Sequence, residues 1–160
     1  CINNYSYGCL TFMTMSHKHT KIQLLSAWGC LLMGSGIYLL FRSRQHLGFI
    51  LLDSVGLASA VDAIRTLTRD IAVPEFVRFC LLDALWTSSY ILFSDYANRS
   101  ERIMARILWI SIIPLLGVIS ELLQFAGIIP GTFDPLDLAC YTLPLLLWIG
   151  WLLHDYRKAF

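Results

Sequence analysis

Long apolar stretches separated by short polar ones dominate the pattern along the chain. The clearest stretch runs from Ile22 to Phe41 without a charged residue, and Arg42 and Arg44 follow it. At a rise of about 1.5 Å per residue, about 20 helical residues cross the roughly 30 Å hydrocarbon core of a bilayer. The pattern therefore predicts a first membrane-spanning helix over residues 22–41.

Three later stretches have the length and composition of further spans, and they cover residues 76–93, 103–125 and 135–153. The second of them contains Pro114, which removes one backbone hydrogen bond and predicts a kink that a helical bundle can accommodate. The residues between the last two stretches, 127–134, are rich in glycine and proline and predict a turn.

The stretch from Leu47 to Ile64 is less clear, because it contains Asp53, Asp62 and two glycines. It is either a spanning helix packed inside the bundle or a shallow one. A polar connection over residues 65–75 follows, in which Pro74 is suited to the first turn of the next helix. Counting this stretch, the sequence predicts an all-α fold, a polytopic transmembrane helical bundle of about five helices.

This pattern divides the chain into an N-terminal tail over residues 1–21, a transmembrane helical domain over 22–153 and a C-terminal tail over 154–160. The sequence begins at Cys1, whereas Met15 opens a more natural start. We therefore expect the residues before Met15 to be a non-native extension or a tail.

Composition supports a membrane protein. Hydrophobic residues make up 57% of the chain and charged residues 14%, against about 25% charged residues in ordinary soluble domains. A soluble core of this size could not bury so much apolar surface, so the lipid bilayer is the first expected partner. No stretch is basic enough to indicate nucleic-acid binding.

The distribution of lysine and arginine indicates an orientation, because these residues are enriched in cytoplasmic loops. With five spans, the C-terminus is weakly favoured on the cytoplasmic side, and the turn at 127–134, which has no basic residue, is expected outside. If the stretch 47–64 does not span, the N-terminus moves inside and the rest keeps its orientation.

Several carboxylates lie in or beside the apolar stretches, where an unpaired charge costs at least about 2.5–3.5 kcal/mol. Glu121 and Gln124 share one helix face, and Asp134 and Asp137 have the same spacing where the last helix begins. Tyr141 lies one turn further on. The predicted topology brings all of these to the outer membrane face.

The third predicted span starts on the same side, and Asp83 lies in its first half, with Trp86 shortly after it. The functional-cluster candidates are therefore Asp83, Trp86, Glu121, Gln124, Asp134, Asp137 and Tyr141. Crowded carboxylates can share protons or bind a hard cation. Alternatively, Asp134 caps the last helix and the other acids pair with Arg78 and with backbone groups.

No established catalytic or nucleotide-binding motif is present, so catalytic residues are unknown and enzymatic activity is uncertain. We predict no cofactor and no metal site. The five cysteines form no CxxC pair, and we interpret them as packing residues rather than as disulfides or ligands.

A family resemblance rests on Glu121-Leu-Leu-Gln124 followed by Ile129-Pro-Gly-Thr-Phe-Asp134-Pro-Leu-Asp137-Leu-Ala-Cys-Tyr141. This segment resembles the signature of VanZ-like membrane proteins, in which E-x-x-Q ends one helix and D-x-x-D opens the next after a Pro/Gly turn. Leu82-Asp83-Ala84-Leu85-Trp86 is similar to a further element of that family. In the turn, where many members carry an arginine, this chain has Gly131-Thr132.

The resemblance implies a multi-pass protein of the bacterial inner (plasma) membrane, in a family linked to resistance to the glycopeptide antibiotic teicoplanin. The polar signature on one membrane face, without a recognised catalytic set, favours a non-enzymatic cell-envelope protein that binds a lipid-linked cell-wall component or a partner membrane protein through the outer polar cluster. Two alternatives stay open. One is a membrane enzyme that uses the carboxylates on a lipid-linked substrate, and the other is a small ion-coupled transporter subunit.

Overall fold

The computed structural model describes residues 17–42 and 47–158, and within these ranges the chain is helical without a strand. The helices are α2 (His17–Phe41), α3 (Leu47–Ser54), α4 (Ala58–Thr68), α5 (Glu75–Arg78), α6 (Cys80–Ala97), α7 (Ile103–Phe125) and α8 (Pro135–Lys158). The predicted all-helical class is confirmed. The question of a start at Met15 falls outside the described residues.

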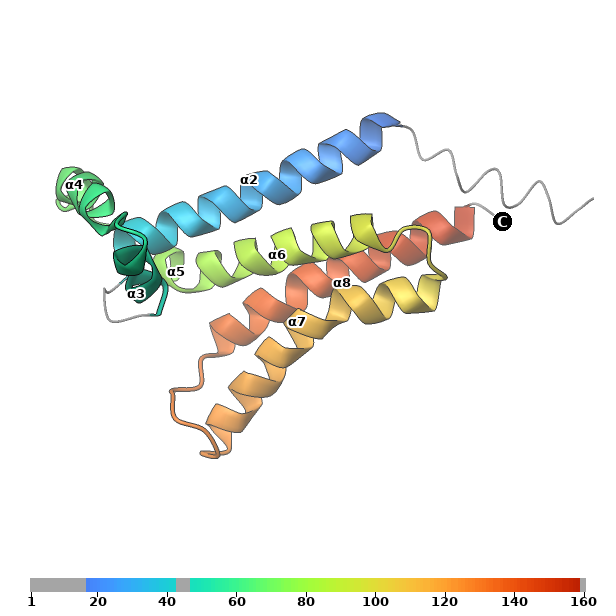
Figure 1. Cartoon of the computed structure of the whole chain (residues 1–160). Helices are drawn as coiled ribbons and strands as arrows, with labels where there is room; N and C mark the ends of the chain where they lie inside the picture. Colours follow the sequence, from blue (N-terminus) through green and yellow to red (C-terminus); the bar gives the residue numbers. More distant parts are fainter. Residues whose placement is uncertain (1–16, 43–46, 159–160) are drawn as a thin grey trace, which may run out of the picture.

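Four of the described helical stretches are long and apolar enough to cross a membrane: Thr20–Phe41, Glu75–Ala97, Ile103–Phe125 and Pro135–Asp155. They run up and down in a bundle, so that α2 begins and α8 ends at the same end of the molecule (Figure 1). We call this the terminal end. The opposite end, which carries α3, α4, α5 and the α7–α8 turn, is the short-helix end.

The stretch 47–64, for which a spanning helix was one alternative, is broken into two short helices. Gly56, which follows α3 after Val55, adopts a φ of 74°, a left-handed conformation that favours glycine. The Gly56 N–H donates to the Asp53 carbonyl and the Leu57 N–H to the Leu52 carbonyl, at 3.2 and 3.0 Å. This is the double hydrogen bond of a Schellman cap, and it ends α3 long before a membrane could be crossed.

α4 lies crosswise to α2 and is viewed almost along its axis in Figure 1. None of its residues is buried, and the apolar side chains of Ile64 and Leu67 are exposed. A helix with one polar and one bare apolar face is typical of segments that lie in the membrane interface. The structure therefore supports the alternative in which the stretch 47–64 is shallow rather than membrane-spanning.

The helices α6, α7 and α8 all pack on one another, whereas α2 contacts only α6 among the other three long helices. The core of the three-helix group contains Ile91, Ile110, Leu145 and Leu152. The contact between α2 and α6 is close at Gly34, where an added Cβ would lie 2.7 Å from Trp86 Cδ1. Glycine at this position lets the Trp86 ring lie directly against the α2 backbone.

Pro114 is buried in the middle of α7. The helix bends along its length, and its second half leans away from α6 (Figure 1). A proline inside a helix lacks the N–H for one backbone hydrogen bond and crowds the preceding turn. The bend therefore follows from the sequence, and it carries the α7–α8 turn outward at the short-helix end.

Candidate functional site

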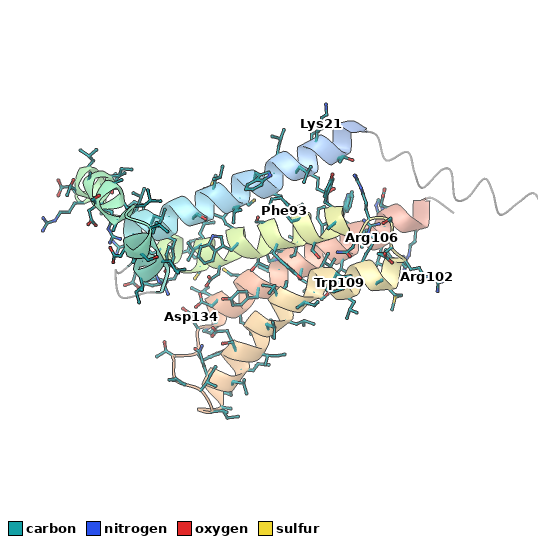
Figure 2. The ribbon with its side chains drawn as sticks, in the orientation of Figure 1. Lys21, Phe93, Arg102, Arg106, Trp109 and Asp134 are labelled. Carbon is teal, nitrogen blue, oxygen red and sulfur yellow. The ribbon has the colours of Figure 1, made fainter. Side chains whose placement is uncertain are left out.

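Polar side chains from three helices gather at the short-helix end, and we call them the carboxylate cluster. Its members are Cys80 and Asp83 on α6, Glu121 on α7, Asp134 directly before α8, and Asp137 and Tyr141 on α8. Figure 2 shows Asp134 at the start of α8, with Arg106 far away toward the terminal end.

Asp134 begins α8 as its N-cap. The Leu136 N–H donates to Asp134 Oδ1 at 2.8 Å, which satisfies one of the free N–H groups of the first turn. Pro135 occupies the first helical position, where its missing N–H costs nothing. The capping role expected of Asp134 is confirmed.

Glu121 holds this cap against α7. Its side chain is buried, with 6% of its surface exposed, and its Oε2 accepts a hydrogen bond of 3.2 Å from the Asp134 N–H. A buried carboxylate needs such a donor because burial removes its water. Glu121 therefore fixes the position of Asp134 across the α7–α8 turn.

Gln124 has a structural role in the same turn. Gly131 has a φ of 142°, and a Cβ added to it would lie 2.6 Å from Gln124 Cδ. The Gln124 side chain thus lies against the bare backbone of the turn. Before it, Gly127 ends α7 in a Schellman cap, with hydrogen bonds of 2.9 Å from the Gly127 N–H to the Gln124 carbonyl and from the Ile128 N–H to the Leu123 carbonyl.

Asp83 and Tyr141 join α6 to α8. The Tyr141 side chain lies close to the Asp83 carboxylate, and Asp137 lies close enough to interact with both electrostatically. The Tyr141 ring fills the space over Gly117, where an added Cβ would lie 2.7 Å from its Cγ. This packing orients the Tyr141 hydroxyl toward α6.

Asp137 is the member of the cluster whose hydrogen bonding is incomplete. Its Oδ1 is buried and has no hydrogen-bond partner among the described residues. No ion pair joins Arg78 to these carboxylates in the described part of the chain, so the alternative in which Arg78 neutralises them is not observed. A buried oxygen without a donor is costly unless a ligand or an ion supplies the missing contact.

Cys80, Asp134 and Asp137 have the spacing of a potential metal site. One ligand atom from each lies within 4.8 Å of the others. Around one zinc ion, thiolate and carboxylate ligand atoms lie roughly 3.3–3.8 Å apart. Small side-chain rotations would therefore bring this set around an ion, and its mixed sulfur and oxygen donors suit zinc better than calcium.

Trp86 is separate from the cluster. Its ring lies against Gly34 and 5.4 Å from the ring of Tyr38, so it belongs to the α2–α6 contact. Of the candidates predicted from sequence, the structure thus brings together Asp83, Glu121, Asp134, Asp137 and Tyr141. It places Gln124 beside them in the turn and Trp86 in the contact between α6 and α2.

Two groups of functional interest were missed by the sequence analysis. Cys80 was interpreted as a packing residue because its neighbours are apolar, and only the contact between α6 and α8 shows its thiol beside Asp137. At the terminal end, Asp95 and Arg106 form a buried ion pair. Asp95 and Arg106 lie on either side of the short α6–α7 connection, and this spacing in the sequence could have indicated the ion pair.

The chain matches no protein-family model, and comparison with curated proteins and with solved structures finds no similar protein. The VanZ-like resemblance of the segment 121–141 stays a prediction. The findings together establish a helical protein with the character of a membrane-embedded bundle and a carboxylate cluster at one of its ends.

Proposed function

We propose that this protein is a VanZ-like protein of the bacterial cell envelope, which binds a lipid-linked cell-wall component through the carboxylate cluster and contributes to glycopeptide (teicoplanin) resistance. The observation that carries the proposal is the convergence of Asp83, Glu121 and Asp137 from three helices at the short-helix end. Glu121 and Asp134 have structural roles in the α7–α8 turn and the cap of α8. Asp137 Oδ1, by contrast, has no hydrogen-bond donor among the described residues.

The distribution of basic residues supports an outer location for this cluster. Basic residues at the terminal end are Lys18, Lys21, Arg99, Arg102, Arg106, Arg157 and Lys158, whereas those described at the short-helix end are Arg42, Arg65, Arg69 and Arg78. The excess at the terminal end favours a cytoplasmic location for both chain termini. The carboxylate cluster would then face the side on which the cell wall is assembled.

The chemistry of the cluster indicates which part of such a component it would hold. Carboxylates accept hydrogen bonds, and these are strongest from ammonium groups and other charged donors. The peptide and sugar portions of cell-wall intermediates carry amines, amides and hydroxyls, which would supply the donor that Asp137 Oδ1 lacks. Partial burial of the site strengthens each such bond.

The test compares isosteric variants of cluster acids with matched controls at the same end. Glu121→Gln and Asp137→Asn should abolish the glycopeptide-resistance phenotype, because each removes a negative charge while keeping the side-chain shape. Glu75→Gln and Asp70→Asn change exposed acids of the same end and should leave the phenotype unchanged. The readout is teicoplanin susceptibility of a deletion strain that expresses each variant, with membrane insertion checked by fractionation.

Wild-type susceptibility in both cluster variants, at wild-type protein level, would overturn the proposal. An equal loss in the cluster and control variants would also overturn it, because the effect would then follow from total charge rather than from the cluster.

A second candidate is a membrane enzyme that acts on a lipid-linked substrate, and the spacing of Cys80, Asp134 and Asp137 favours it. These residues would hold a divalent ion, which supplies Lewis-acid activation and an activated water. Metal content of the purified protein tests this candidate. Cys80→Ser should lower bound zinc at least about tenfold, whereas Cys30→Ser, at a cysteine of α2 outside the group, should not.

Metal content at background level in the wild-type protein would contradict the enzyme candidate without affecting the binding proposal. The third alternative, a small ion-coupled transporter subunit, stays a prediction.

A further inference from the structure

A second polar site lies at the short-helix end, between α4 and the last turn of α2. It is a cavity of about 400 Å³, which is within the usual range for small-molecule sites. Three arginines line it, Arg65, Arg69 and Arg78, together with a single acid, Asp62. None of these residues belongs to the carboxylate cluster.

The polar wall of the cavity is one face of α4. Asp62, Arg65, Thr66 and Arg69 follow a spacing of three and four residues, which places them on the same side of a helix, and all four line the cavity. The opposite side carries Leu67, whose surface is 83% exposed. With its apolar side in lipid, α4 would direct the arginine-lined cavity to the level of the lipid headgroups.

Arg65 fixes the position of this wall. Its Nη1 donates to the Leu39 carbonyl at 3.1 Å and its Nη2 to the Arg42 carbonyl at 2.9 Å. Both carbonyls belong to the C-terminal turn of α2, where backbone acceptors have no helical partner. Arg65 therefore attaches α4 to α2, and the other two arginines are the ones that can bind a ligand in the cavity.

Arg69 and Arg78 are the other two arginines of the cavity wall. The Nε of Arg78 is buried and has no hydrogen-bond partner among the described residues, and Arg69 is exposed at the end of α4. A buried guanidinium nitrogen without an acceptor is costly. The two side chains come from different elements and line one cavity, which is the arrangement that lets guanidinium groups hold a phosphate from two sides.

The rest of the cavity wall is apolar and includes Leu40, Phe41 and Ile71. Leu40 and Phe41 belong to the last turn of α2, so the cavity lies where a lipid chain meets its headgroup. An anion without an apolar tail would use only the arginines. A phosphate attached to a hydrocarbon chain would contact both walls.

We propose that this cavity binds the phosphate group of a membrane lipid, with Arg69 and Arg78 as the phosphate-binding residues. Basic pockets between membrane-spanning helices are one known type of binding site for anionic lipid headgroups. The phosphate could come from a bulk phospholipid or from an isoprenyl phosphate that carries a cell-wall precursor. This inference uses residues outside the carboxylate cluster and does not require the function proposed above.

The experiment measures binding of defined probes to the purified full chain by native mass spectrometry. The probes are phosphatidylglycerol, a long-chain isoprenyl monophosphate, the matching isoprenyl alcohol and inorganic phosphate. Saturable binding is expected for the two phosphate lipids and not for the alcohol. Arg69→Gln and Arg78→Gln should each weaken it at least about tenfold, since each removes charge-assisted hydrogen bonds.

Arg102→Gln is the matched control, because Arg102 is also an exposed arginine but lies at the terminal end (Figure 2), where its side chain makes no capping hydrogen bond. It should bind lipid as the wild type does. Arg69 is exposed, so Arg69→Gln is expected to fold and carries the test alone if Arg78→Gln does not.

Tighter binding of the isoprenyl phosphate would assign the cavity to a lipid-linked intermediate, and tighter binding of phosphatidylglycerol would assign it to bulk lipid; both results support the proposal. Equal binding of phosphate lipid and alcohol, undiminished binding by Arg69→Gln, or an equal loss in Arg102→Gln would overturn it. Glu121→Gln, which tests the carboxylate cluster, should leave lipid binding unchanged, so failure of one proposal is distinguishable from failure of the other.

Discussion

Arg106 and Asp95 neutralise each other inside the helical bundle at the terminal end. Arg106 Nη2 lies 2.6 Å and Arg106 Nε 3.1 Å from Asp95 Oδ1, and both residues are almost fully buried. The Gln23 side-chain amide donates to Asp95 Oδ2 at 3.0 Å. One carboxylate thus connects α2, α6 and α7.

Breaking this ion pair should strongly destabilise the protein. Arg106→Met leaves Asp95 buried without its cation, which costs about 3–5 kcal/mol in comparable buried pairs. Thermal unfolding in detergent, followed by circular dichroism, measures the loss. Glu101→Gln changes an exposed acid of the neighbouring connection and should have little effect. A double variant with Asp95→Leu and Arg106→Met should recover much of the stability, because no unpaired charge remains.

Gly34 should be the glycine of α2 that tolerates substitution least. In Gly34→Ala the new Cβ meets the Trp86 ring at 2.7 Å, whereas at Gly29 an added Cβ meets nothing within 4 Å. We expect Gly34→Ala to lose about 1–3 kcal/mol by overpacking and Gly29→Ala to lose nothing. The same unfolding measurement compares the two variants. Equal stability of both would mean that α2 does not approach α6 at this position.

Gly131→Ala should disturb the α7–α8 turn in two separable ways. Its φ of 142° is strained for a residue with a side chain, and the Cβ collides with Gln124. We expect a loss of about 1–3 kcal/mol. Adding Gln124→Ala should recover the part due to collision and leave the part due to strain. No recovery in the double variant would show that Gln124 does not cover the turn.

Topology can be tested with three exposed positions replaced by cysteine and labelled from outside intact cells with a membrane-impermeant thiol reagent. Lys21→Cys and Ser100→Cys lie at the terminal end and Thr132→Cys at the short-helix end. Only Thr132→Cys should react before permeabilisation, and the parent protein with its native cysteines is the control. Opposite labelling of Lys21→Cys and Ser100→Cys would instead require a span between α2 and α6, as in the five-helix alternative.

The long helices could be predicted from sequence because long, predominantly apolar stretches of span length have few alternatives to a helix in lipid. The predicted start and end of the span at 103–125 coincide with α7, and Pro135 begins α8 as expected. The break at Gly56 was not decided by the sequence. Glycine is common inside membrane helices, and only the local hydrogen bonds determine that Gly56 ends one.

The candidate site was predicted where its residues lie close in sequence. Glu121, Asp134 and Asp137 flank one turn, so their proximity follows from any short connection between α7 and α8. Cys80 and the Arg78 cavity depend on how α6 packs on α8 and how α4 lies against α2. These contacts join residues far apart along the chain, and hydrophobic periodicity carries no information about them.

The position of the Arg106–Asp95 pair has a consequence for the order in which the helices enter the bilayer. The residues lie on either side of the α6–α7 connection, so a hairpin of these two helices can insert with Arg106 and Asp95 already paired. Separate insertion would expose each charge to lipid at a cost of about 2.5–3.5 kcal/mol. Residues 22–41 of α2 carry no charge, so this helix can insert into the membrane on its own. Gln23 then reaches Asp95 only when the hairpin docks, which makes this hydrogen bond a late step of assembly.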